Sequence, residues 1–423
     1  MKKKILIITK YEWDDRLASG NTLSNFFEGW DDVEIYNIYC RDTLPNNNCC
    51  QNYFSVSPLN IVKNVLRPWK IGQNFVYCHD KTNSSFCSKT ESSLKLLSKK
   101  HQRVFDYAYD ILYSSKLWLN RRIKEFIGKI NPDMVFVFGT PDPLNYYLIC
   151  YLRNKINVPV VTYFVDDHYN KIGTWFDCLY WIQKSRLKKI AEMSSKCYAI
   201  SQPMCEEYSD AFKKEFTLLF KGCDISYNKS SVNSPIRFVY AGNMLYGRNH
   251  ILTEMASILA SVNNSMVKTH LDIYTSTILD VRTQEQLNIP GVSTIHAPKP
   301  YKEIKKILRE SDVVLHVESF EKEQINIVRL SFSTKITDCL QSGSMTLAIG
   351  PPDVASIQFL KKVPGAIVVD DIKNLQSEII SIISNLNNIV TKAKETNDFV
   401  KENLDINKLR NKLRCDLTNE MKS

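Results

Sequence analysis

The sequence predicts an α/β protein with two domains, each built on a mainly parallel β-sheet. A chain of 423 residues is too long for one ordinary hydrophobic core, so two domains of roughly 200 residues each are expected. Short β-branched runs alternate with helical stretches in both halves, and a polar, turn-rich segment at 221–235 separates the two alternations. Such alternation, with strands that are almost continuously apolar, is typical of parallel sheets covered on both faces.

In the first half, strands are expected where β-branched and aromatic residues cluster: Ile5–Thr9, Val33–Tyr39, Met134–Phe138, Val158–Phe164 and Cys197–Ile200. Helices are expected where apolar residues recur at helical spacing: Leu23–Gly29, Leu94–Ser114, Lys116–Gly128, Leu144–Asn154, Trp175–Met193 and Gln202–Phe212. Segment 43–93 is polar and has no clear period. We therefore expect a long loop or a loosely helical insertion there.

In the second half, the strands are expected at Ile236–Tyr240, Lys268–Tyr274, Val292–Ile295, Val313–Val317, Met345–Ile349 and Ala366–Val369. The helices are expected at 250–262, 281–288, 300–310, 333–342 and 353–361, with two more near 371–386 and 389–414. The predicted domains are 1–225 and 226–390, and 391–423 is expected to be a helix that crosses back to the first domain. Two Rossmann-like domains of this kind are expected to face each other across a cleft, with ligands at the carboxyl ends of the strands.

Composition narrows the class of protein. Hydrophobic residues make up 44% of the chain and charged residues 24%, as in globular proteins. No apolar run approaches the roughly 20 residues that span a bilayer, and the apolar stretch after the first lysines is too short for a signal peptide. None of the 12 cysteines has CxxC spacing, so we assign them no metal or redox chemistry. A cytoplasmic location is expected.

Positive charge is concentrated in one part of the chain. The net charge is +10, and residues 51–130 hold 14 Lys and Arg against 5 Asp and Glu. Lys95, Lys99, Lys100 and Arg103 lie there among aromatic and aliphatic residues. Solvated helix faces explain many such charges, but a basic face with aromatics also suits an anionic membrane or nucleic acid. Because the chain has no nucleic-acid-binding motif, we favour peripheral contact with the inner membrane face and no nucleic-acid partner.

The stretch Ser331–Gly343 predicts a short helix with a phosphate site at its start. Ser333 is expected to be the N-cap, and Gly343 stands where a glycine commonly ends a helix. Lys335 in the first turn is unfavourable for the helix dipole, which prefers an acid there. Hydroxyl groups, backbone N–H groups and a lysine at one helix start can together bind a phosphate.

Two further motifs end strands of the same predicted sheet. The strand Phe238–Ala241 runs into Gly242 and Asn243, and Arg248 begins the next helix. The strand Val313–Val317 runs into Glu318. The carboxyl ends of parallel strands meet at one sheet edge, so Arg248, Glu318, Lys335 and Asp338 are expected to converge there. This convergence favours a site for a phosphate-bearing ligand.

These residues resemble a known family. The stretches Tyr240–Arg248 and Ser333–Gly343, with the opening strand and its Gly20 loop, are similar to motifs of bacterial glycosyltransferases of the two-domain GT-B fold. Within that fold the chain most resembles the retaining family 4 enzymes of surface-polysaccharide assembly. The resemblance implies an acceptor-binding first domain and a second domain that binds a nucleotide-sugar, linked to UDP or GDP.

The resemblance also implies roles for individual residues. The residues that it assigns to the donor are Gly242, Asn243, Arg248, Ser333, Thr334, Lys335 and Asp338. Asn243 stands where relatives have arginine and Arg248 where they have lysine, so one cation of the usual pair is missing. Asp338 matches the glutamate that holds the nucleotide ribose. The partner glutamate of that motif is replaced by Leu330, which leaves Glu318 or Glu323 to contact the sugar.

In the first domain, Val158–His168 resembles the strand whose end places a His or Asp beside the reacting sugar carbon. Adjacent strand residues point to opposite faces, so only one of Asp166 and Asp167 is expected to face the site. The other interpretation of Asp166 is a cap on the following helix. His168 is a further candidate. Asp14, Asp15 and Arg16 follow the first strand and either meet the acceptor or are solvated.

The predicted function is transfer of a sugar from a nucleotide-sugar to a lipid-linked glycan or oligosaccharide, with retention of configuration. The sequence contains no Asp-x-Asp, the motif that clamps a metal-bound diphosphate in the other common glycosyltransferase fold. No metal or other cofactor is therefore expected, and Arg248, Lys335 and helix N-termini would stabilise the leaving group. The alternatives are a nucleotide-sugar 2-epimerase on the same fold and a non-catalytic module that binds membranes or nucleic acid.

Overall fold

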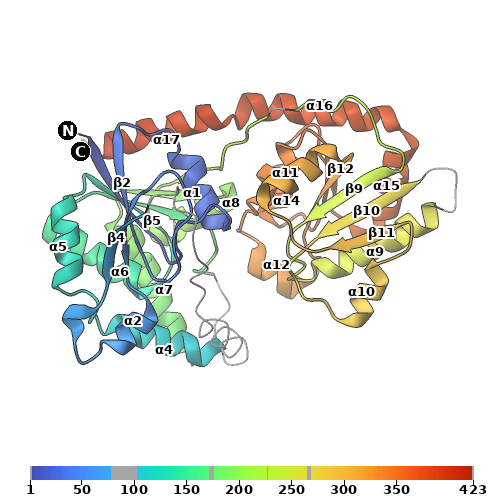
Figure 1. Ribbon diagram of the computed structural model, residues 1–423. Helices are drawn as coiled ribbons and strands as arrows, with labels where there is room; N and C mark the ends of the chain where they lie inside the picture. Colours follow the sequence, from blue (N-terminus) through green and yellow to red (C-terminus); the bar gives the residue numbers. More distant parts are fainter. Residues whose placement is uncertain (1, 78–101, 171–175, 226, 264–267, 422–423) are drawn as a thin grey trace. The chain divides into compact units, whose positions relative to one another are not determined.

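The computed structural model describes residues 2–77, 102–170, 176–225, 227–263 and 268–421. The chain forms two compact units (Figure 1). The first consists of Met1–Leu219 and Arg410–Ser423, and the second of Phe220–Leu409. The observed division therefore lies before the predicted boundary at 225/226, and the chain returns to the first unit at Arg410 instead of at residue 391.

The first unit is built on an eight-stranded sheet with the order β4-β3-β2-β1-β5-β6-β7-β8. Its strands are β1 Lys3–Ile8, β2 Val33–Tyr39, β3 Asn52–Ser55, β4 Gln73–Val76, β5 Met134–Phe138, β6 Val160–Phe164, β7 Lys196–Ala199 and β8 Phe216–Leu218. All neighbours are parallel except β3 and β4. Every residue of β5 and β6 is buried, as expected for strands with both faces covered.

Helices flank this sheet (Figure 1). Their bounds are α1 Ala18–Phe27, α2 Pro58–Lys63, η1 Pro68–Lys70, α4 Gln102–Ser114, α5 Arg121–Ile130, α6 Pro143–Tyr151, α7 Cys178–Met193, α8 Gln202–Phe212 and α17 Ile406–Glu420. A π-helical turn, Leu152–Ile156, follows α6. The prediction of a loop or loosely helical segment at 43–93 was wrong for its described part, because β3, α2, η1 and β4 lie there. Residues 78–93 are outside the described residues, as are Lys95, Lys99 and Lys100.

The second unit is built on a six-stranded sheet, β11-β10-β9-β12-β13-β14, in which all neighbours are parallel. The strands are β9 Ile236–Ala241, β10 Thr269–Tyr274, β11 Ser293–His296, β12 Val313–Val317, β13 Met345–Ile349 and β14 Ile367–Val369. The helices are α9 Arg248–Val262, α10 Val281–Leu287, α11 Tyr301–Glu310, α12 Lys322–Val328, α13 Lys335–Leu340, α14 Ala355–Leu360, η3 Ile372–Asn374, α15 Leu375–Ser384 and α16 Leu386–Asn403. Helix α12 was not predicted.

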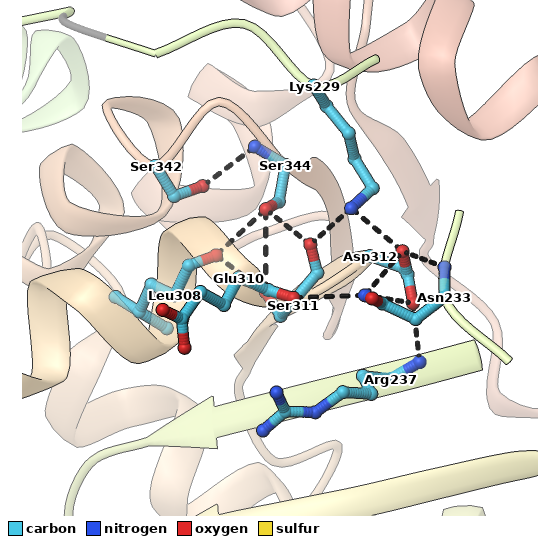
Figure 2. Close-up of polar contacts among 9 residues, drawn as sticks. All are labelled: Lys229, Asn233, Arg237, Leu308, Glu310, Ser311, Asp312, Ser342 and Ser344. Atoms are coloured by element: carbon cyan, nitrogen blue, oxygen red, sulfur yellow. Dashed lines mark hydrogen bonds and ion pairs between the residues drawn. The ribbon is translucent and has the colours of Figure 1, made fainter. Parts of the chain in front are cut away.

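Within the second unit, a buried polar network connects the segment before β9 with the residues that precede β12 (Figure 2). Lys229 Nζ lies 2.8 Å from Asp312 Oδ1 and donates to the carbonyl oxygen of Ser311 at 2.8 Å. Asp312 also accepts hydrogen bonds from the backbone N–H of Asn233 and of Arg237, at 3.0 and 2.7 Å, and from the Asn233 side chain at 3.1 Å. The side chains of Lys229 and Asp312 are only 4% and 0% exposed. This network fixes the segment before β9 to the start of β12.

None of the helices in the described ranges combines the length and the apolar composition needed to cross a bilayer.

Candidate donor site

The order of strands places a ligand site in the second unit between β9 and β12. From β9 the chain adds β10 and β11 on one side of the sheet, and then β12, β13 and β14 on the other. Ligands of open α/β sheets bind outside the carboxyl ends of the strands at such a reversal. Gly242 and Asn243 follow β9, and Glu318 follows β12. The predicted motifs therefore meet at the reversal.

The Arg248 guanidinium is held at this point by three different groups. It donates from Nη2 and Nε to Glu318 Oε2 at 2.8 and 3.1 Å, from Nη1 to Asn243 Oδ1 at 2.7 Å, and from Nε to the Val317 carbonyl at 3.0 Å. Arg248 stands here because α9 begins with it, directly after Gly247, whose φ of 73° is unfavourable for a residue with a side chain. The side chains of Arg248 and Glu318 are largely buried, with 11% and 4% of their surface exposed. The pair is therefore a rigid part of the site.

Glu318 is buried beside His316, whose ring nitrogen Nε2 lies 3.5 Å from Glu318 Oε1 and 3.0 Å from Ser356 Oγ. Burial raises the pKa of Glu318, and the adjacent Arg248 guanidinium opposes this rise. Burial, with the nearby Arg248 and Lys335 cations, lowers the pKa of His316 to about 3. The imidazole is therefore neutral at neutral pH, and it packs against Glu318 without adding charge.

Lys335 is the second cation of the site. Its ammonium group lies directly against the α-carbon of Gly242, where a Cβ atom would collide with Nζ. Within the described ranges, Lys335 Nζ forms no hydrogen bond or ion pair, although Glu318 and Asp338 attract it from a longer distance. Burial and the Arg248 charge lower the pKa of Lys335 to about 8. The cations Arg248 and Lys335 outnumber the carboxylate of Glu318. Because Arg248 is paired with Glu318, the net positive charge of the site lies on Lys335.

A small pocket lies among these groups. It has a volume of about 10 Å³ and is lined by Tyr240, Ala241, Arg248, Leu315, His316, Val317, Glu318, Ser333 and Lys335. The prediction that Ser333 caps α13 was wrong. The N-cap residue is Thr334, its side chain makes no capping hydrogen bond, and Ser333 contributes only its carbonyl, to the N–H of Ile336. The Ser333 side chain is thus not engaged in capping the helix.

Asp338, which was expected to converge with Arg248, Glu318 and Lys335, acts on Lys335 through its charge, but it makes its hydrogen bonds to other residues. Its Oδ1 accepts hydrogen bonds from the Tyr301 hydroxyl at 2.7 Å and from the Gln341 side chain at 3.1 Å. Lys221 Nζ lies 3.8 Å from the same oxygen. Tyr301 comes from α11, so Asp338 belongs to a second polar cluster beside α13 and α11.

In the first unit, the two aspartates after β6 differ in environment. Asp167 is buried, and its Oδ1 accepts from the Tyr208 hydroxyl at 2.8 Å and from the backbone N–H groups of Tyr169 and Asn170 at 3.2 and 3.0 Å. Asp167 therefore stabilises the turn after the strand. Asp166 is exposed.

Residues after β1 are bonded locally. Asp14 is buried, and its carboxylate oxygens accept hydrogen bonds from Arg16: Nε donates to both oxygens and Nη2 donates to Oδ2. Asp15 accepts from Ser24 Oγ at 2.5 Å, and burial raises its pKa. The alternative of freely solvated acids is therefore wrong for Asp14 and Asp15. In the parts of the chain that the structure describes, no group of three His, Cys, Asp or Glu side chains is arranged to hold a metal ion.

The position of His316 beside Glu318 was not predicted. It stands two residues before Glu318, and residues two apart in a strand lie on the same face, so the spacing could have indicated this neighbour. Its partner Ser356 comes from α14, far along the chain, and no local pattern connects the two. Tyr301 and Lys221, the partners of Asp338, are equally remote in sequence.

Comparison with known proteins identifies the fold. The sequence matches no protein-family model, and a search among curated proteins finds no relative. Among solved structures, Anabaena HepE in complex with UDP has a TM-score of 0.64 at 11% identity, over 99% of this chain and 100% of HepE. TarM has a TM-score of 0.64 at 10% identity, over 100% of this chain and 99% of TarM.

Sucrose-phosphate synthase from Thermosynechococcus elongatus has a TM-score of 0.60 at 11% identity, over 99% of each chain. These neighbours are glycosyltransferases of the GT-B type, and the similarities extend over both units. At such low identity they establish the fold and leave the activity to be argued from the site. The chain has the two-domain α/β GT-B fold that the sequence predicted.

Proposed function

We propose that the protein is a glycosyltransferase that binds a nucleotide-sugar donor at the carboxyl ends of β9 and β12 in its second unit. The observation that carries this proposal is Lys335, an ammonium group without a hydrogen-bonding partner in the described structure, lying against Gly242 beside the Arg248–Glu318 pair. Placing a cation in a partly buried site is unfavourable unless an anion neutralises it. The diphosphate of a nucleotide-sugar is such an anion.

Each residue would have a separate part in the transfer. Lys335 would stabilise the negative charge that develops on the leaving diphosphate, and Gly242 lets the backbone approach it closely. Arg248 is already held by Glu318 and Asn243, so little entropy is lost when it meets the donor. Glu318 would contact the sugar, since its Oε1 accepts no hydrogen bond from Arg248. Ser333 and Thr334 would add hydroxyl donors. Asp338 would meet the ribose through Oδ2, since the hydrogen bonds from Tyr301 and Gln341 both reach Oδ1.

The donor and the acceptor are also proposals. HepE has been crystallised with UDP and with UDP-glucose, and TarM with UDP, which favours a UDP-linked donor here. We propose that the acceptor is a lipid-linked glycan of surface-polysaccharide assembly, that configuration is retained, and that no metal is required. In the first unit, Asp166 and Asp167 both remain candidates for contact with the reacting sugar: Asp166 is exposed, and the three hydrogen bonds that Asp167 accepts all reach its Oδ1.

A panel of UDP- and GDP-sugars tests the class of activity. Thermal stabilisation by one nucleotide-sugar, followed by its slow hydrolysis to the free nucleotide, is the expected result for a transferase without its acceptor. Lys335→Met should abolish the stabilisation, whereas Lys394→Met, at an exposed lysine of α16, should retain it. Conversion of the sugar into its epimer without release of nucleotide would contradict the proposal. So would the absence of any response to the panel.

A further inference from the structure

An apolar and basic segment, residues 62–70, lies exposed on the first unit. Leu66 is 90% exposed, Trp69 62% and Val62 59%, which are high values for large hydrophobic side chains. Isolated exposed hydrophobic residues are common, but here they are gathered within nine consecutive positions. We call residues 62–70 the docking segment; it runs from the last two residues of α2 to the end of η1.

The charge of this segment has one sign. Lys63, Arg67 and Lys70 lie between the apolar residues, and all three are exposed. No Asp or Glu occurs from residue 43 to residue 79, so nothing in the neighbouring sequence neutralises these cations. Within the described residues none of the three forms an ion pair with a carboxylate. The segment therefore presents cations and apolar side chains to solvent together.

The docking segment is held in shape at both ends. Ile61 before it and Ile71 after it are fully buried. The N–H of Gly72 donates to Asn60 Oδ1 at 2.8 Å, which closes the loop at its base. The side chain of Asn120, the N-cap of α5, donates to the carbonyl oxygens of Pro68 and Ile71 at 2.7 and 2.8 Å. Arg122 donates to the carbonyl of Lys70 at 3.0 Å.

More exposed apolar side chains lie on the adjoining helices. Helix α2 packs against α4, and on α4 the side chain of Val104 is 67% exposed. Arg103 of α4 binds Asp177, the N-cap of α7, at 2.7 Å. Phe176, the residue before this N-cap, is 89% exposed. In Figure 1, α2, α4 and α7 lie at the same end of the first unit.

We propose that the docking segment is a membrane-contact element that lies on the surface of a bilayer containing anionic phospholipid. Cations attract the headgroups, while Leu66 and Trp69 enter the boundary between headgroups and acyl chains, where tryptophan is particularly favourable. A closed, preorganised loop loses little entropy on binding. The inference deepens the proposed function, which supplies the reason for docking: a lipid-linked acceptor lies in the membrane.

Co-sedimentation of the full-length protein with vesicles tests this inference. The protein should bind vesicles of phosphatidylcholine with phosphatidylglycerol at low salt and be released at high salt. Replacing Lys63, Arg67 and Lys70 together with Gln should weaken partitioning roughly 100-fold, from the typical contribution of each cation near an anionic surface. Leu66→Ser should weaken it roughly tenfold, because the leucine side chain would no longer leave water.

Matched control variants distinguish an effect of the docking segment from an effect of the protein's overall charge. Lys362, Lys394 and Lys401 are exposed lysines of the second unit, and changing all three to Gln removes the same charge elsewhere. This variant should bind as the parent does. Brominated phospholipid should quench the fluorescence of the parent more than that of Trp69→Phe, and this variant should still sediment with vesicles.

Three outcomes would overturn the inference: no binding to anionic vesicles at low salt, equal loss in the two triple variants, or equal binding to neutral and anionic vesicles. Binding of UDP in the absence of vesicles gives an independent readout of the proposed donor site. If the docking variants keep UDP binding but lose vesicle binding, both proposals stand. If UDP binding fails while vesicle binding persists, only the proposed function is contradicted.

Discussion

The Lys229–Asp312 pair provides a test of how the second unit is held together, because its two halves should not be equivalent. Asp312 has three hydrogen-bond donors besides Lys229: two backbone N–H groups and the Asn233 side chain. Among the described residues, the Lys229 ammonium has the Ser311 carbonyl as its one other partner besides Asp312. Removing the carboxylate charge therefore leaves a poorly compensated buried cation, whereas removing the lysine leaves a buried carboxylate that still accepts hydrogen bonds from two backbone N–H groups and the Asn233 side chain.

The magnitudes follow from this difference. Lys229→Met removes about one charge-assisted hydrogen bond and should lower the free energy of unfolding by about 1.5–3 kcal/mol. Asp312→Asn breaks a buried ion pair and leaves the ammonium largely unpaired, so about 3–5 kcal/mol is expected. As a control, Lys394→Met changes an exposed lysine of α16 and should stay within about 0.5 kcal/mol of the parent.

The distribution of tryptophan makes the assay specific for one unit. All 6 tryptophans lie in the first 181 residues, so their fluorescence reports on the first unit alone. In urea titrations, far-UV circular dichroism should show an earlier transition in both Lys229 and Asp312 variants, while the tryptophan transition stays where it is. A larger loss in Lys229→Met than in Asp312→Asn, or values for both equal to the control, would refute the reasoning.

Four further outcomes are expected. UDP affinity should fall as the pH rises through about 8, because Lys335 loses its charge there, and calorimetry should show a weaker fall for Lys335→Arg, whose charge persists. Gly242→Ala should displace the flexible end of Lys335, lowering UDP affinity while the melting temperature changes little; a large loss of stability would contradict this. Glu318→Gln should lower the free energy of unfolding by about 3–5 kcal/mol, because it leaves Arg248 buried without its counter-charge; unchanged urea denaturation would argue against a buried pair. Sugar transfer should survive EDTA, and loss on chelation that Mg²⁺ restores would contradict metal-independent chemistry.

Of the four strands whose bounds were predicted without error, three are fully buried, and the fourth, Val33–Tyr39, is buried over part of its length. For Met134–Phe138, Val313–Val317 and Met345–Ile349 the predicted and observed bounds coincide, since an unbroken apolar run bounded by polar residues has one interpretation in an α/β chain. The short strands β3 and β4 were missed. Each has four residues; β4 is the edge strand and β3 lies next to it, so pairing with other strands decides their conformation.

The candidate site shows the same division between local and distant information. Gly242, Arg248 and Glu318 could be placed at one sheet edge because each follows a strand or starts the next helix. The hydrogen-bond partners of these side chains could not be predicted in this way. Nothing in the sequence near Asp338 indicates that Tyr301 would bind its carboxylate, because Tyr301 lies 37 residues earlier in the chain.

The central claim is that the ammonium of Lys335 binds the diphosphate of the donor. Calorimetric titration of UDP into the parent, Lys335→Met and Lys394→Met tests it most directly. Loss of one charge-assisted contact, about 1.5–3 kcal/mol, predicts roughly 10- to 150-fold weaker binding for Lys335→Met and no change for Lys394→Met. Equal UDP affinity in the parent and in Lys335→Met would contradict the assignment of the donor site.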